Sequence, residues 1–147
     1  MDPGPRAGDS DLPPARARGR MSIVRELDCI TLHVTDLEAS RRFYRDVMGF
    51  RELVFAQGLL VFALPGGARL SMHVQEPGEP GRPAGTVSGL MFGVDDCAKA
   101  VEALRGRGAD VLEGPWKAPW GPTYATVADP SGNEFLLIER DRPLPAP

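Results

Sequence analysis

One short pattern occurs twice in the chain, at an interval of 60 residues. Residues 34–36 read Val-Thr-Asp and residues 94–96 read Val-Asp-Asp, and each triplet joins an alternating apolar and polar stretch to a stretch with helical spacing. Self-similarity at a fixed period is the signature of a repeated supersecondary unit. The chain is therefore predicted to fold as two copies of one module.

Module one spans residues 27–76. Residues 27–34 alternate strictly, which is typical of a half-buried strand with one apolar face. Residues 35–38, Thr-Asp-Leu-Glu, have the form of a capping box, and apolar residues follow at helical spacing until Gly49. Three short strands separated by turn residues complete the module, over residues 52–55, 59–64 and 69–75.

Module two, residues 87–140, repeats this order after a Pro- and Gly-rich linker at residues 76–86. Alternation restarts, Asp95-Asp96 precedes a second helix, and three strands follow over residues 109–112, 123–128 and 134–139. The predicted fold class is α+β, with paired βαβββ modules. Each module has one face covered by its helix and one open face, so the two open faces are expected to form a cup.

The 147 residues are enough for one domain with a real core, which is expected over residues 23–140. Residues 1–22 and 141–147 are rich in Pro and poor in large apolar side chains, so both are expected to be disordered tails. Met1 and Met21 both remain open as the biological start.

Charge and composition exclude several classes of partner. A net charge of −3 and a pI near 5.4 give no attraction for nucleic acid. No apolar run approaches the roughly 20 residues that span a bilayer, and no signal peptide is recognisable, so no membrane partner is expected. Two cysteines without a CxxC spacing indicate reduced thiols and a cytoplasmic location.

Three motifs in the chain resemble those of the vicinal oxygen chelate (VOC) superfamily, over about residues 27–140. They are His33-Val34-Thr35-Asp36-Leu37-Glu38-Ala39-Ser40 with Phe43-Tyr44 and Gly49-Phe50, then Gly93-Val94-Asp95-Asp96, then Asp129-Pro130-Ser131-Gly132-Asn133. The superfamily includes glyoxalase I, extradiol dioxygenases, fosfomycin-inactivating transferases and bleomycin-resistance proteins. The resemblance implies an open, cup-shaped eight-stranded barrel (the glyoxalase/bleomycin resistance fold), a homodimer, and a site inside the cup.

The resemblance also implies where a metal would bind. Enzymes of the superfamily hold a divalent metal through the first and last strands of each module, and the corresponding positions here are Cys29, Ser71, Gly89 and Leu136. Two of these residues have no donor atom, and a stable catalytic site needs about three protein ligands. We therefore expect no metal and no cofactor, as in members that bind and sequester small molecules.

The only two histidines, His33 and His73, are predicted to lie on the open faces of their strands. They could form a displaced metal site, with Cys29 or Glu134 as a further ligand, or could hydrogen-bond a bound molecule. The alternative is that both histidines are ordinary polar residues that line a water-filled cavity or a dimer contact.

The other candidate ligand-binding residues are Met91, Trp116, Trp120, Tyr124 and Glu134. The three aromatic residues lie in a Pro-rich segment that is expected to be a loop, where they could stack on a flat ligand or anchor the loop. Glu134 could be a general base or bind a cation, or it could be a solvent-exposed strand end. Met91 lies between Gly89 and Gly93, which leave space for a ligand or for close packing of the modules.

These observations favour a metal-independent small-molecule binding protein that sequesters an apolar or aromatic compound, such as an antibiotic or another toxic molecule. The alternative is a glyoxalase-type lyase or dioxygenase with a rearranged metal site that uses His33 and His73. A third hypothesis is an interaction module whose open face is closed by another protein. Catalytic residues, the ligand, and whether modules pair within or between chains stay open.

Overall fold

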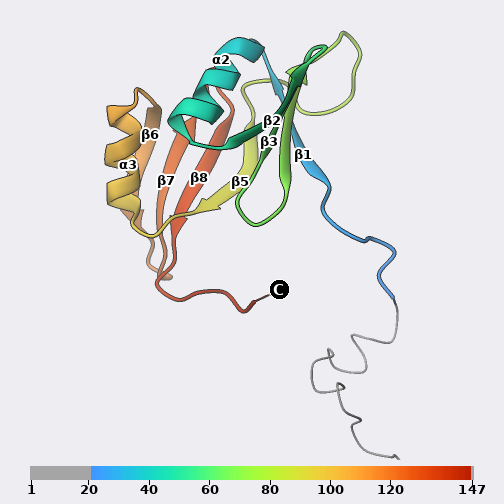
Figure 1. Ribbon diagram of the computed structural model, residues 1–147. Coiled ribbons are helices and arrows are strands. Elements are labelled where there is room, and N and C mark those ends of the chain that lie inside the picture. The colour runs from blue at the N-terminus through green and yellow to red at the C-terminus, as the bar shows by residue number, and fades with distance from the viewer. Residues whose placement is uncertain (1–20, 147) are drawn as a thin grey trace, which may run out of the picture.

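The computed structural model describes residues 21–146, so all but the last two residues of the expected tail at 1–22 lie outside the described part of the chain. Two modules of the same element order follow one another (Figure 1). The first consists of β1 (Cys29–Val34), α2 (Leu37–Arg42), the π-helical continuation η2 (Phe43–Val47), β2 (Arg51–Ala56), β3 (Leu59–Ala63) and β4 (Arg69–Val74). The second consists of β5 (Val87–Gly93), α3 (Cys97–Gly106), β6 (Asp110–Lys117), β7 (Thr123–Ala128) and β8 (Glu134–Glu139).

Each module builds one four-stranded mixed sheet with the same strand order. The order is β1-β4-β3-β2 in the first sheet and β5-β8-β7-β6 in the second. In both sheets the first and last strands of the module pair in parallel, and the hairpin strands pair in antiparallel fashion. The identical order confirms the predicted repeat and the α+β class of paired βαβββ modules.

The covered faces of the two sheets share one hydrophobic core with η2 and α3. The ring of Tyr44 lies 6.1 Å from that of Phe62 in the first sheet and 6.4 Å from that of Phe135 in the second. The ring of Phe43, also in η2, lies 6.2 Å from that of Phe135 in β8. Module one therefore contributes its helix to the core of module two, and the open faces lie on the other side of each sheet.

A buried carboxylate joins the two modules at the turn after β7. Asp129 accepts the hydroxyl of Tyr44 at 2.8 Å and the side-chain amide of Asn133 at 3.1 Å. Its other oxygen accepts the backbone N–H groups of Ser131 and Asn133, which closes the turn. The Asn133 amide also donates to the backbone carbonyl of His33 in β1. The turn predicted from Asp-Pro-Ser-Gly is thus a connection between the modules as well.

An aspartate caps the N-terminus of both helices. In the first helix the cap is Asp36, one residue later than the Thr35 that a capping box at residues 35–38 would use. Asp36 accepts the N–H of Ala39 at 3.0 Å, and Asp96 accepts the N–H of Lys99 at 3.0 Å. Thr35 does not cap the helix, because its N–H and hydroxyl contact Ser131 of the other module.

Strand β6 is longer than predicted, and this corrects the expected loop at the tryptophans. Trp116 pairs with Tyr124 inside the sheet, after register shifts on both sides of Glu113. Gly114 has φ +103°, and a Cβ atom there would lie 2.6 Å from the backbone oxygen of Tyr124. Glycine lets the strand bend and continue at this point, which strand propensity alone does not reveal. No helix in the described residues has the length and apolarity to cross a membrane.

Replacing Tyr44 with phenylalanine is expected to destabilise the protein by about 1.5–3 kcal/mol, because a buried hydrogen bond to a charged group is lost. Chemical denaturation measures this change. Tyr124→Phe is the matched control, since its hydroxyl only accepts an exposed bond from Trp120 and its loss should change stability by less than about 0.5 kcal/mol. Equal effects of the two substitutions would contradict the role assigned to the Tyr44–Asp129 bond.

The burial of Tyr44 beside Asp129 should also make the free energy of unfolding depend on pH in the alkaline range. Burial, followed by the nearby Asp129 carboxylate, raises the pKa of Tyr44 well above its usual value. The unfolded chain loses this proton near pH 10 while the folded chain keeps it, so the free energy of unfolding falls as pH rises above about 10. In Tyr44→Phe this part of the decline should be missing when denaturation is compared between about pH 9 and 11.

Candidate functional site

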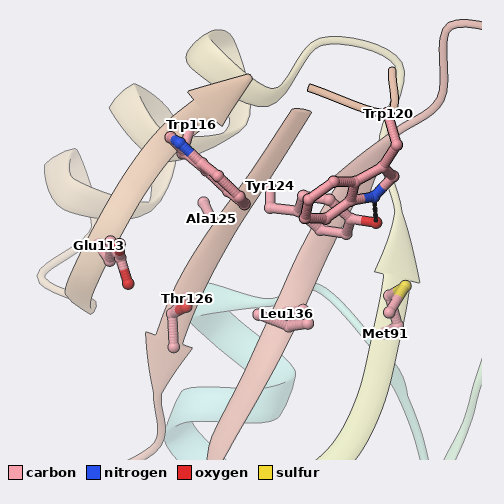
Figure 2. Close-up of a pocket in the computed structure, with 8 residues that line it drawn as sticks. All are labelled: Met91, Glu113, Trp116, Trp120, Tyr124, Ala125, Thr126 and Leu136. Carbon is pink, nitrogen blue, oxygen red and sulfur yellow. Dashed lines mark hydrogen bonds between the residues drawn. The ribbon is translucent and has the colours of Figure 1, made fainter. Parts of the chain in front are cut away.

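A cavity of about 410 Å³ opens on the second sheet, and we refer to it as the aromatic pocket (Figure 2). All of its lining residues come from module two. They are Met91, Glu113, Trp116, Trp120, Tyr124, Ala125, Thr126 and Leu136. The structure therefore brings together four of the residues predicted to bind a ligand, namely Met91, Trp116, Trp120 and Tyr124.

Strand alternation builds the floor of the aromatic pocket. Leu136 lies opposite Met91 in β5 and opposite Thr126 in β7, so these three side chains form a row across the open face. The residues on either side of Leu136, Phe135 and Leu137, point to the opposite face and are buried in the shared core. The position where the resemblance expected a metal ligand, Leu136, is thus part of an apolar floor.

Three aromatic rings form one side of the pocket. The Trp116 ring lies 5.5 Å from that of Trp120 at 76° and 6.2 Å from that of Tyr124 at 30°. The indole N–H of Trp120 donates to the Tyr124 hydroxyl at 3.3 Å. Trp116 and Trp120 nevertheless remain 47% and 67% exposed, so much of their surface is free to stack on a flat molecule.

Two carboxylates lie near this surface, and the sequence pointed to only one of them. Glu134 does not line the aromatic pocket but a smaller adjoining cavity of about 160 Å³, which shares Thr126 and Leu136 with it. Glu113 lines the aromatic pocket itself. It was missed because the strand was expected to end at residue 112, and its bulged position only follows from the bend at Gly114.

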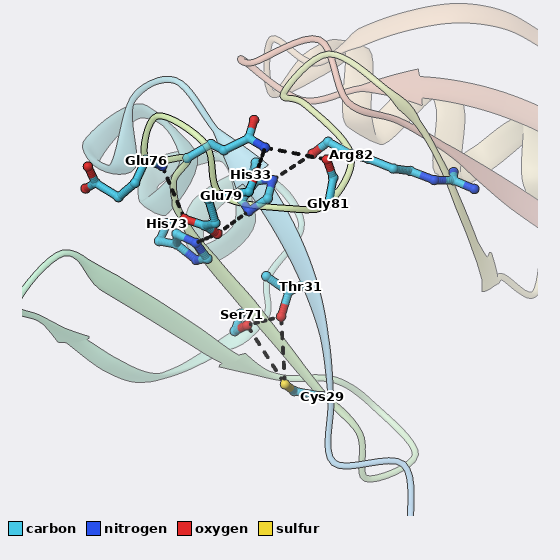
Figure 3. Close-up of polar contacts among 10 residues, drawn as sticks. Cys29, Thr31, His33, Ser71, His73, Glu76, Glu79, Gly81 and Arg82 are labelled. Atoms are coloured by element: carbon cyan, nitrogen blue, oxygen red, sulfur yellow. Dashed lines mark hydrogen bonds and ion pairs between the residues drawn. The ribbon is translucent and has the colours of Figure 1, made fainter.

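The two histidines lie apart from the aromatic pocket, on the open face of the first sheet. They are paired neighbours in β1 and β4, with ring centroids 4.8 Å apart at 83°. Glu79 of the linker places one carboxylate oxygen 2.8 Å from Nε2 of His33 and 2.6 Å from Nε2 of His73 (Figure 3). We call these three residues the histidine cluster. The partner is Glu79, and not Cys29 or Glu134 as the displaced-site hypothesis suggested.

Hydrogen bonds shift the pKa values of two members of this cluster, His33 and Glu79. Nδ1 of His33 donates to the backbone carbonyl of Arg82 at 2.6 Å, and this bond is the main cause that raises the pKa of His33. Hydrogen bonds from His73, from the backbone of Glu76 and from His33 lower the pKa of Glu79 to about 2. No sequence signal predicts this contact, because Glu79 lies in a Pro- and Gly-rich segment without periodicity.

The four positions suggested by the resemblance do not fit a divalent metal. Cys29 Sγ lies 4.0 Å from Ser71 Oγ on the first sheet, but the Ser71 hydroxyl is already paired with Thr31 Oγ1 at 2.8 Å. Gly89 and Leu136, on the second sheet, carry no donor atom.

Solved structures of similar chains share this architecture. TnmS3, described as an antibiotic binding protein from Streptomyces sp. CB03234, is 28% identical; the match covers 82% of this chain and 100% of TnmS3, with a TM-score of 0.71. A glyoxalase/bleomycin resistance protein from Streptomyces sp. CB03234 is 30% identical, with 76% and 98% covered and a TM-score of 0.62. A superfamily member from Sphaerobacter thermophilus DSM 20745, 24% identical with 81% and 100% covered and a TM-score of 0.69, supports the fold alone.

None of the curated proteins matches the chain. A family model, in contrast, matches residues 26–137, which include module one, the linker and module two as far as the middle of β8. Together with the strand order and the solved neighbours, this match shows that the chain belongs to the Glyoxalase/Bleomycin resistance protein/Dioxygenase superfamily.

Proposed function

We propose that this protein binds a flat apolar or aromatic small molecule in the aromatic pocket and sequesters it without chemical change and without a metal ion in that pocket. The observation that carries the proposal is the set of three clustered aromatic rings, of which both tryptophans remain about half exposed or more above an apolar floor. Most ligand sites in proteins are concave surfaces of this kind, lined by apolar and aromatic groups with few polar ones.

The chemistry of the lining supports binding rather than catalysis. Glu113 is the one carboxylate among the eight lining residues, and the lining contains no histidine, cysteine, lysine or serine. The hydroxyl groups of the lining belong to Thr126 and Tyr124, and no second base lines the pocket to activate them. A single carboxylate beside aromatic rings is suited to a hydroxyl or an amine on an otherwise apolar ligand. The similarity to an antibiotic binding protein, TnmS3, is the reason to propose an antibiotic as the ligand.

We further propose that the protein is a homodimer in which the open faces are covered by a second copy. Apolar side chains on these faces are 39–64% exposed in the single chain, namely Val54, Leu59, Val87 and Met91. Apolar surface of this kind on a sheet favours association, and two-fold dimers are the commonest assembly.

The alternative of a glyoxalase-type lyase or dioxygenase has one observation in its favour, the histidine cluster, which contains the two histidines that it requires. Such an activity would need a divalent metal. Loss of the activity with a chelator, and its return on adding the metal, would distinguish the enzyme from a binding protein.

Ligand binding is tested with a planar aromatic antibiotic of the anthraquinone class and with bleomycin, in the presence of a chelator. We expect quenching of tryptophan fluorescence and binding heat by calorimetry, because both tryptophans line the pocket. Trp116→Ala should weaken binding at least about tenfold, since a stacked ring and its buried area are worth about 1.5 kcal/mol or more.

The matched control is Leu112→Ala, which removes a side chain of similar exposure from the same strand outside the pocket and should leave affinity unchanged. Binding by neither compound, or equal binding by Trp116→Ala and the parent, would refute the proposed site. Binding without any quenching would favour anchoring of the β6–β7 turn as the role of the tryptophans.

Native mass spectrometry is expected to show two chains per particle. Leu59→Glu places a charge on the open face of β3 and should shift the protein to monomers, because an unpaired buried charge is costly at an interface. Glu102→Lys, on the exposed surface of α3, should leave the dimer intact. A monomeric parent protein at micromolar concentration would overturn the dimer.

A further inference from the structure

In the histidine cluster, the contact between Nε2 of His33 and a carboxylate oxygen of Glu79 requires a proton or a metal ion between the two atoms. A carbonyl oxygen only accepts hydrogen bonds, so Nδ1 of His33, 2.6 Å from the Arg82 carbonyl, carries a proton. In the neutral ring, Nε2 then presents a lone pair to a carboxylate oxygen of Glu79 at 2.8 Å. Two lone pairs repel each other at this distance, so either a second proton or a metal ion lies between them.

The donor atoms converge as metal ligands do. Nε2 of His33, Nε2 of His73 and a carboxylate oxygen of Glu79 all lie within 4.8 Å of one another. Two imidazoles and a carboxylate are a donor set that binds Zn²⁺. The bond from Nδ1 of His33 to the Arg82 carbonyl is also the outer hydrogen bond that a ligating histidine usually makes, and it leaves Nε2 as the free donor.

The surroundings leave room for an ion. The ligand atoms of a tetrahedral Zn²⁺ lie about 3.3 Å apart, so the present separations of 2.6 and 2.8 Å need to widen by roughly half an ångström. Glu79 lies in the linker, and its side chain is 26% exposed, so it can make this movement. A cavity of about 250 Å³ beside the cluster has space for water as a further ligand. Arg82 points its guanidinium away from the cluster, toward the backbone of Val87 (Figure 3).

We propose that His33, His73 and Glu79 bind one Zn²⁺ ion, which fastens the linker at residues 76–86 to the open face of the first sheet. This site differs from the superfamily positions, since His33 lies four residues beyond Cys29 in β1 and His73 lies two beyond Ser71 in β4. Its role is structural: the ion joins the linker to β4, which directly precedes it, and to β1, whose His33 lies 46 residues before Glu79. Gly81 permits this closure, because a Cβ atom there would lie 2.9 Å from the His33 ring.

The test uses full-length protein freed of metal by a chelator and then titrated with Zn²⁺ alone and with Co²⁺ alone. We expect one equivalent bound per chain by calorimetry, visible ligand-field absorption with Co²⁺, and a higher thermal midpoint with Zn²⁺. Glu79→Gln and His73→Gln should each weaken binding at least about 100-fold, because each removes one of only three protein ligands.

Glu76→Gln is the matched control, since it neutralises an exposed carboxylate in the same linker and should leave affinity unchanged. Cys29→Ser tests the superfamily position and should also leave it unchanged. Absence of Zn²⁺ and Co²⁺ binding, or binding that survives Glu79→Gln, would overturn the proposal and leave a shared proton in the cluster. The aromatic ligand is assayed with chelator present, so failure of this site and failure of the aromatic pocket are separate results.

Discussion

The two modules depend on one buried carboxylate whose hydrogen-bond partners come from both of them. Asp129 closes its own turn in module two and accepts the hydroxyl of Tyr44 from module one, while Asn133 extends the network to β1. A buried carboxylate is tolerated only when its oxygens are satisfied, so the two modules have to dock in one orientation. The core that the two sheets share around η2 follows from this docking, and so does the position of each open face.

This arrangement separates two kinds of chemistry within one chain. The first sheet presents two imidazoles that meet a carboxylate from the linker, whereas the second presents aromatic rings above an apolar floor. The two open faces were expected to meet in one cup, but in the single chain the aromatic pocket is lined by module two alone. The repeated scaffold therefore carries two distinct surfaces.

Much of this structure could be predicted from the sequence because its signals are local. Alternation and turn residues indicated the eight strands of the described residues, although β6 continues to Lys117, and the cap at Asp96 followed from residues next to its helix, whereas the first helix is capped by Asp36 and not by Thr35. The contacts that define the sites are different in kind. Glu79 reaches the histidines from an irregular linker, and Glu113 reaches the pocket through a bulge, so both depend on tertiary geometry that has no period in the sequence. The resemblance gave the fold, and Leu136 of the expected metal positions lines the aromatic pocket, but the resemblance contained no information on where else donor atoms would gather.

The row formed by Met91, Thr126 and Leu136 also affects how this protein can change over time. Each of these residues alternates with a neighbour that is buried in the core, so recognition and folding are encoded at interleaved positions of the same strands. Substitutions at every second position can therefore reshape the ligand surface while the packing that stabilises the domain stays intact. A scaffold of this kind can acquire new ligand specificities one substitution at a time, because each variant keeps the core packing that stabilises the fold.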